Sequence, residues 1–398
     1  MLDTPSGIRD AARLLESRTN EGRSDSFFRE LGEILPSIDR RRISLRRLFE
    51  AFVHDGRELV QHMQPGYHAD GTTALLEAGD AVNTGNFSSI IGQITYSSVM
   101  ANLDTPDFIG QNLVTTVPAT TQEVEVIPGI SMVGDVAEDV GEGSEYPVVG
   151  VSEEFVTAPR KVKDGFILPI TEEAIWEDKT GLLMTRVNTA SQSMGITLER
   201  EILDTVLGQT TSYSRNGGAA QATYGNTHTN GTFDNLSAST ALANYTDIED
   251  ALKLFDAITD PNTGDPIMIG GNLDIIVPTA LEFTALNIMQ ATNIQVGDTT
   301  SATVPVTVAS NPLIKQSRRT FNLHTSAFVK DRTSSATTWF IGNSKGAFEY
   351  REVWPIQVFR ADRNSDAGFN RDVVTAVKVR RKGAPAIVEP RHMVKCTA

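Results

Sequence analysis

The stretch that decides the fold is Asp135–Asp178, DVAEDVGEGSEYPVVGVSEEFVTAPRKVKDGFILPITEEAIWED, an arm with too little apolar sequence for a core of its own. Seven acids and no base lie between residues 134 and 154, and three bases then follow within four residues. If residues 146–150, which include a proline, form the tip, the acidic and basic stretches lie on opposite sides of a two-stranded hairpin. An isolated hairpin of this length is marginal in water. The arm therefore predicts a chain that grips copies of itself.

A long helix is predicted directly after the arm, in LLMTRVNTASQSMGITLEREILDTVLG, residues 182–208. Its apolar positions step by three or four residues and are Leu183, Val187, Ala190, Met194, Leu198, Ile202 and Val206. At 1.5 Å per residue this segment makes a rod of about 40 Å. Weak helix formers around Gly195 predict a bend, and Gly208 predicts the end of the helix.

A second domain is predicted to begin near Tyr245. Thr246 and Asp247 are placed to cap a helix that runs through residue 258, a buried strand covers 273–277, and Pro278 starts a helix to about residue 291. Further strands are expected at 304–308, 321–328, 337–341, 346–358 and 373–379. Residues 26–63 predict two or three short amphipathic helices, and 113–130 predicts a strand that ends at Pro128.

The chain of 398 residues carries a net charge of −15, which argues against binding nucleic acid by neutralising its phosphates. One basic cluster stands out: RRRISLRR holds Arg40, Arg41, Arg42 and two further arginines. It indicates either a solvated helix face or a contact to an acidic neighbour or to nucleic acid. No apolar run approaches the roughly 18 residues of a membrane helix, and residues 1–10 lack signal-peptide features, so no membrane partner is expected.

One enzyme motif is present. Residues 342–346 fit G-x-S-x-G around Ser344, and Asp362, Asp366, Asp372 and His392 follow in the Ser, Asp, His order of α/β-hydrolases. That chemistry needs a strained strand-to-helix turn, whereas the sequence after residue 346 alternates like a strand and favours a β-hairpin turn. The histidines form no HExxH, the acidic run lacks calcium-loop spacing, and no phosphate loop occurs. We therefore predict no catalytic, cofactor-binding or metal-binding residue.

The order of these elements resembles the major capsid proteins of tailed bacteriophages, whose fold is shared with bacterial encapsulin shells and some gene-transfer-agent heads. Residues 136–178 resemble the family's extended loop returning into its peripheral domain, and 182–208 resemble its spine helix. LDIIVPTALEFTALNIM, at 273–289, is typical of the axial domain. The closing strands WFIGNSKGAFEYREVWPIQVF and RDVVTAVKVRRKGAPAIVEP are similar too.

The resemblance implies an α+β phage major capsid fold in six segments. These are an N-terminal arm with short helices at 1–110, a first peripheral part at 111–133, an extended β-hairpin loop at 134–166, the peripheral domain with its spine helix at 167–244, an axial domain at 245–345, and returning strands with a tail at 346–398. The expected intersubunit contacts are Asp135, Glu138, Asp139, Glu142, Glu145, Arg160, Lys161, Lys163, Arg40, Arg41 and Arg42.

In function, the resemblance implies a non-enzymatic subunit that self-assembles, as hexamers and pentamers, into an icosahedral virion shell. The shell would enclose double-stranded DNA without sequence-specific binding, assemble in the host cytoplasm, and meet portal, scaffold or decoration proteins. An encapsulin-like or gene-transfer-agent shell is the alternative within this class. A serine hydrolase using Ser344 is the alternative from a different class.

Overall fold

In this computed structural model, the described residues are 108–128, 139–140, 142, 145–146, 154–171, 182–210, 213–226, 228, 233–260, 264–296, 307–311, 313, 319–362 and 373–398. The chain divides into two compact units. Unit 1 is Met1–Thr105, Lys163–Ile196 and Pro355–Arg381; unit 2 is Pro106–Val162, Thr197–Trp354 and Lys382–Ala398. The predicted helices of residues 26–63 lie outside the described residues. The six predicted segments stay a prediction.

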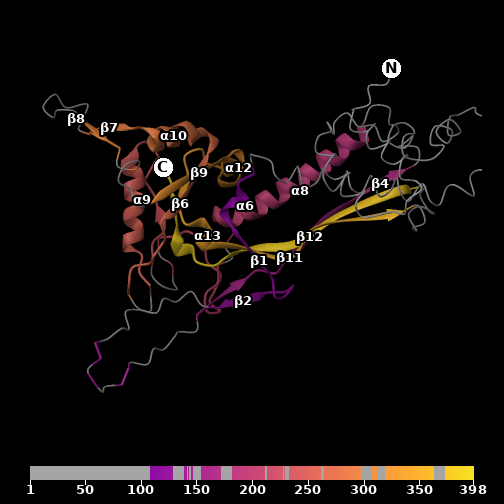
Figure 1. The fold of residues 1–398 in the computed structure, drawn as a ribbon, viewed down its shortest axis with the longest axis horizontal. Helices are drawn as coiled ribbons and strands as arrows, with labels where there is room; N and C mark the ends of the chain where they lie inside the picture. The colour runs from indigo at the N-terminus through magenta and orange to yellow at the C-terminus, as the bar shows by residue number, and fades with distance from the viewer. Residues whose placement is uncertain are drawn as a thin grey trace, which may run out of the picture. The chain divides into compact units, whose positions relative to one another are not determined.

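The described chain contains both helices and strands (Figure 1). The helices are α6 (Gly110–Leu113), α8 (Leu182–Val206), α9 (Tyr245–Ala257), η3 (Thr279–Leu281), α10 (Glu282–Gln290), α12 (Ala327–Thr333), α13 (Ser344–Ala347) and η4 (Pro390–His392). The strands are β1 (Thr115–Pro118), β2 (Glu125–Pro128), β3 (Phe155–Ala158), β4 (Val162–Thr171), β5 (Leu236–Ser237), β6 (Asn272–Pro278), β7 (Asn293–Val296), β8 (Thr307–Ser310), β9 (Thr320–Ser326), β10 (Trp339–Gly342), β11 (Phe348–Asp362), β12 (Val373–Ile387) and β13 (Met393–Cys396). This mixture confirms the α+β class.

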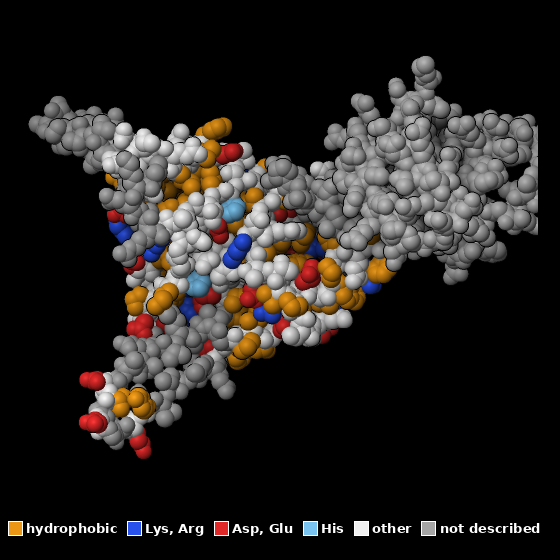
Figure 2. Space-filling model, in the orientation of Figure 1, with side chains coloured by type: hydrophobic (Ala, Val, Ile, Leu, Met, Phe, Trp, Pro, Cys, Tyr) orange, Lys and Arg blue, Asp and Glu red, His pale blue; other side chains and the backbone are white. Residues whose placement is uncertain are grey.

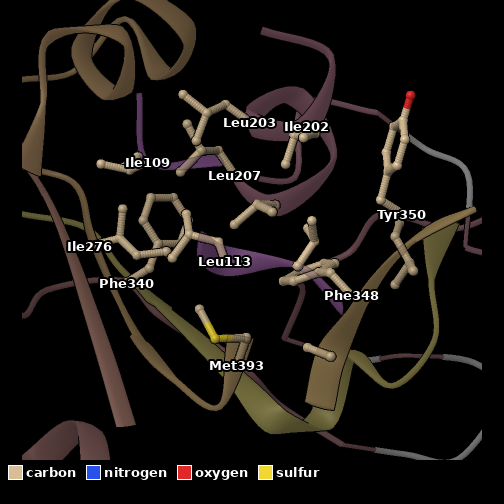
Figure 3. Packing of buried hydrophobic residues seen from close by; sticks show 14 of the residues in the cluster. Ile109, Leu113, Ile202, Leu203, Leu207, Ile276, Phe340, Phe348, Tyr350 and Met393 are labelled. Carbon is tan, nitrogen blue, oxygen red and sulfur yellow. The ribbon is translucent and has the colours of Figure 1, made fainter. Parts of the chain in front are cut away.

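A five-stranded sheet, in the order β5-β13-β10-β6-β9, carries a core on each face in unit 2. Successive side chains of a strand point to opposite faces. On β10, Trp339 and Ile341 therefore enter one apolar cluster, whereas Phe340 enters the other. The first cluster also takes residues from α9 and α10 (Figure 1). The second packs Phe340 against Leu113 of α6 and the last turns of α8 (Figure 3).

The long helix predicted after the arm is confirmed as α8. Leu198, Ile202 and Val206 are buried in the second cluster, as their helical spacing predicted. The helix ends before Gly208, whose backbone has φ +68 and whose missing side chain leaves room for the Tyr224 ring. The apolar period and the terminal glycine thus fix both the length and the buried face of this element.

Most of the helices and strands predicted after Tyr245 are confirmed, with corrections at their ends. Asn244, rather than the predicted pair, caps α9, and Asp247 completes the capping box from the N3 position. The strand predicted through residue 328 ends at Ser326, because its hydroxyl accepts a hydrogen bond from the backbone of residue 328 and starts α12. The strand expected to end at residue 379 continues to Ile387 as β12.

A second sheet, in the order β1-β11-β12-β4, contains the two longest strands. Within unit 2, β1 runs parallel to the first part of β11, in a register that pairs Thr115 with Glu349 and Pro118 with Glu352. The chain continues from β1 into β2, so the pairing of β1 with β11 fixes where the chain enters β2.

Candidate intersubunit contact site

A short ribbon frames the predicted loop. Strands β2 and β3 pair antiparallel, from Glu125 opposite Ala158 to Pro128 opposite Phe155, so the chain leaves the ribbon at residue 129 and returns at 154. The predicted extended β-hairpin loop at 134–166 stays a prediction. The returning strand ends at Ala158, and β4 begins a new strand at 162. We call residues 124–128 and 155–159 the ribbon, and residues 129–154 the loop.

The ribbon has an inverted polarity. Glu125 and Ile127 of β2 are buried, whereas Val126 and Pro128 are exposed. Ile127 packs with Ala158 and with two apolar residues near the C-terminal end of the chain. On the outward side, Val124 and Val126 are 55% and 57% exposed. The apolar side chains of a half-buried strand ordinarily face the core. Here a glutamate is buried and two valines are exposed, which is the reverse of that expectation.

The buried glutamate is held by an ion pair. Lys161 Nζ lies 2.7 Å from Glu125 Oε2, and the two side chains are 0% and 6% exposed. Thr120 donates to the other carboxylate oxygen from its hydroxyl at 2.6 Å and its backbone at 3.2 Å, and Arg351 Nη1 lies 3.6 Å away. Burial alone raises the pKa of Glu125, but the hydrogen bonds from Lys161 and Thr120 lower it to about 2. The carboxylate is therefore ionised over the whole physiological range.

The bases after the loop pair with acids before it. Arg160 contacts Glu123 at 3.1 Å on the surface, and Lys161 contacts Glu125 inside. These two pairs correct the prediction that the basic stretch lies opposite the acids of residues 135–145 along one hairpin. Lys161 cannot offer its ammonium to a neighbouring subunit, because it is buried. Arg160 and Lys163 are exposed.

The loop is anchored at its return. Glu154 pairs with Arg215, and both side chains are largely buried. Phe155 donates its backbone N–H to Asn216 Oδ1 at 3.0 Å, and the Asn216 N–H returns a bond to the Phe155 carbonyl at 2.8 Å. No sequence pattern points to either partner, because residues 215 and 216 lie 61 positions away in a stretch rich in small polar residues.

Most of the loop residues that the structure describes are exposed. Asp139, Glu142 and Glu145 are exposed acids, and Tyr146 is 81% exposed. Figure 2 shows acidic side chains beside apolar ones at the lower left. The remaining predicted contacts, Asp135, Glu138, Arg40, Arg41 and Arg42, lie outside the described residues. Their role stays a prediction.

Ser344 does not have the surroundings of a nucleophile. It is fully buried at the start of α13, and its hydroxyl donates to Asp274, whose other oxygen lies 3.1 Å from His324 Nε2. A serine hydrolase needs a histidine next to the serine to take its proton. The helical turn α13 also replaces the predicted hairpin turn, and the strand predicted to begin at residue 346 begins at Phe348 as β11. Of the hydrolase aspartates, Asp366 and Asp372 lie outside the described residues.

The described ranges also bear on metal-binding and membrane-spanning sites. Among those residues, no group of three or more His, Cys, Asp or Glu side chains could hold a metal ion. None of the described helices is both long and apolar enough to span a bilayer.

Comparison with known proteins gives one strong match. A family model described as phage capsid protein matches residues 155–396, more than half of the chain. No curated protein matches.

Three solved structures with low TM-scores are also similar. One from Mycobacterium phage Bobi has 13% identity and a TM-score of 0.41, over 72% of this chain and 89% of that chain. A virus-like particle from Pyrococcus furiosus has 11% identity and 0.41, over 76% and 98%. The capsid of an empty GTA particle has 9% identity and 0.43, over 73% and 90%. With TM-scores of this size, these likenesses carry no weight for function.

Proposed function

The chain belongs to the phage capsid protein family and is a shell-forming major capsid protein, and we propose that the loop and ribbon are its contact to neighbouring copies. The observation that carries this proposal is the anchoring of the loop. Two ion pairs and the paired strands hold its ends, while Asp139, Glu142, Glu145 and Tyr146 are exposed. A loop that is held at its ends and exposes these residues between them is suited to bind a separate subunit.

The assembled state we propose is an icosahedral head made of hexamers and pentamers, built in the host cytoplasm. Closed symmetric assemblies repeat one set of contacts many times, so each contact can be modest. Portal, scaffold or decoration proteins would join the same shell. Exposed acids on the loop attract basic side chains of a correctly placed neighbour and repel acidic side chains of a wrongly placed one. They therefore favour the correct alignment of two subunits.

The cargo we propose is double-stranded DNA, enclosed without sequence-specific binding. A net charge of −15 gives the chain no general affinity for phosphates, so the DNA must be retained by the closed wall rather than by contacts. We propose no enzymatic activity. The burial of Ser344 and its bond to a carboxylate support that view.

Replacing residues 130–153 with an Asn-Gly turn tests the loop. Because Pro128 and Phe155 are already paired, a two-residue turn can close the ribbon without moving either strand. The subunit should keep its circular dichroism spectrum and its monomeric stability but form no shells by electron microscopy. A charge-only control, Glu142→Gln with Glu145→Gln, keeps the loop and should still assemble. Normal shells from the loopless variant would refute the proposal.

A further inference from the structure

We infer that the buried side chain of His228 is a proton-sensitive latch on residues 213–216, the anchor segment that holds the return end of the loop. Neutral pH closes this latch, and mild acid loosens it. The inference rests on the proposed function, since it concerns how the same loop is regulated. Three features of the structure carry it: the surroundings of the imidazole, the hydrogen bond that fixes its neutral form, and its contacts with the anchor segment.

The imidazole of His228 is enclosed by aromatic rings, and the residue is only 3% exposed. Its ring stacks on Phe233 with the centroids 4.2 Å apart, and it meets the ring of Tyr213 edge-on at 6.4 Å. An imidazolium in such a cage would give up its hydration. The charge that acts on the imidazole is that of Asp234, which is exposed. Further charges, on Arg215, Glu389 and Arg391, act on the Tyr213 hydroxyl.

One hydrogen bond fixes the neutral form of the ring. Nε2 of His228 lies 3.2 Å from Asn235 Oδ1. That oxygen is an acceptor, because the amide nitrogen of Asn235 donates to the carbonyls of Thr223 and Pro390 at 3.0 and 3.1 Å. Nε2 therefore carries the hydrogen. Nδ1 faces the uncharged amide of Gln221 at 3.4 Å, so a proton added at Nδ1 meets an amide rather than a carboxylate.

The cage bears directly on the anchor segment. The backbone of Tyr213 exchanges two hydrogen bonds with that of Gln221, at 3.3 and 2.8 Å, and the side chain of Gln221 is the one that faces Nδ1. Three positions after Tyr213, Asn216 exchanges two hydrogen bonds with Phe155 at the start of β3. A ring that leaves the cage therefore withdraws support from the residues that hold the end of the loop.

The direction of the pH effect follows from burial. Burial lowers the pKa of His228 below its ordinary value of 6.5, against the opposing effects of the bond to Asn235 and the charge of Asp234. When the cage opens, the imidazole regains water and its ordinary affinity for a proton. Protons therefore bind the open cage more strongly than the closed one. The stability of the closed cage is fully present above about pH 6.5 and is lost as the pH falls below that value.

Amide hydrogen exchange in the unassembled subunit tests the latch. The amides to follow are those of Tyr213, Asn216 and Thr157, which are bonded within the anchor segment or across it. After correction for intrinsic exchange rates, their protection should fall by about twofold to tenfold from about pH 7.5 to about pH 5.5. His228→Gln keeps a donor for Asn235 but cannot take up a proton, so its protection should change by less than about twofold.

A second variant covers the case in which His228→Gln fails to fold. Gln221→Glu places a carboxylate beside Nδ1, so the protonated ring gains an ionic partner and the loss in acid should shrink to less than about twofold. The matched control is His324→Gln. His324 already lies 3.1 Å from the Asp274 carboxylate and belongs to β9, away from the anchor segment, so this variant should lose protection as the wild type does.

A wild-type subunit whose protection changes by less than about twofold would overturn the inference. So would a folded His228→Gln or Gln221→Glu subunit that loses protection as the wild type does. Each of these results leaves the proposed function standing, because exchange is measured without assembly. Normal shells from the loopless variant would refute the proposed function and leave the latch on the anchor segment intact.

Discussion

Replacing Lys161 with methionine should loosen the ribbon at the root of the loop. The ammonium is fully buried and bonds Glu125 at 2.7 Å and the Glu123 carbonyl at 3.1 Å. Methionine keeps most of the apolar stem and removes only the charge. The change therefore leaves a buried carboxylate without its cation, which is the expensive way to break a buried pair.

Two estimates of the magnitude agree. The pKa of Glu125 falls from 4.5 to about 2, and each unit is worth 1.36 kcal/mol, so the groups around the carboxylate stabilise its ionised form by about 3 kcal/mol. That figure includes Thr120 as well as Lys161. Removing one partner of a buried pair generally costs about 3–5 kcal/mol. Arg351, 3.6 Å from the carboxylate, offsets part of the loss, so we expect about 3 kcal/mol.

Amide hydrogen exchange measures this loss of stability at the residues of the ribbon itself. Protection of residues 125–127 and 155–158 in the unassembled subunit should fall by on the order of a hundredfold. Arg160→Met is the matched control, because its pair with Glu123 is 3.1 Å long but more than half exposed. Such surface pairs are worth less than about 1 kcal/mol, so protection should change by no more than about fivefold.

A double variant completes the test. Glu125→Gln combined with Lys161→Met removes both charges and leaves an amide oxygen for Thr120, so it should recover most of the lost protection. Equal effects of Lys161→Met and Arg160→Met would refute the reasoning, because burial would then make no difference to the pair.

Three further predictions concern single positions. Because the folded pKa of Glu125 is lowered, its stabilisation is present above pH 4.5 and is lost as pH falls towards about 2; hydrogen exchange should show this loss in the wild type and not in Glu125→Gln. Gly342→Ala should cost more than about 3 kcal/mol by urea denaturation, since φ is +151 and a Cβ would lie 2.1 Å from a carbonyl oxygen, whereas Gly264→Ala, in open space at φ +76, should cost about 1 kcal/mol. Ser344→Ala loses its bond to Asp274 and should cost about 1–2 kcal/mol while shells still form; absent shells would implicate this serine in assembly.

Helices and strands that are marked by a pattern in their own residues could be predicted from the sequence. Ile202 and Val206 repeat at helical spacing and end at Gly208, so α8 required no knowledge of its partners. The strand β6 was likewise visible as an apolar run before Pro278. Ser326 was missed as a helix cap because the same residue also suits a strand, and only the backbone after it decides between the two.

The contact site depended on distant partners and could be predicted only in outline. The arm was recognisable from its acids and its lack of apolar residues. Which acid meets which base depends on the register of β2 against β3, and that register is fixed by Glu125, 36 positions before Lys161. The alternation Glu-Val-Glu-Val at 123–126 held a signal, but alternation alone does not say which set faces inward.

The most direct test of the central claim is the size of the particle that the full chain forms. The purified chain should be examined by sedimentation velocity and electron microscopy over a range of concentration and salt. We predict closed shells of uniform diameter that coexist with free subunits. Small monodisperse monomers under every condition would contradict a shell-forming subunit.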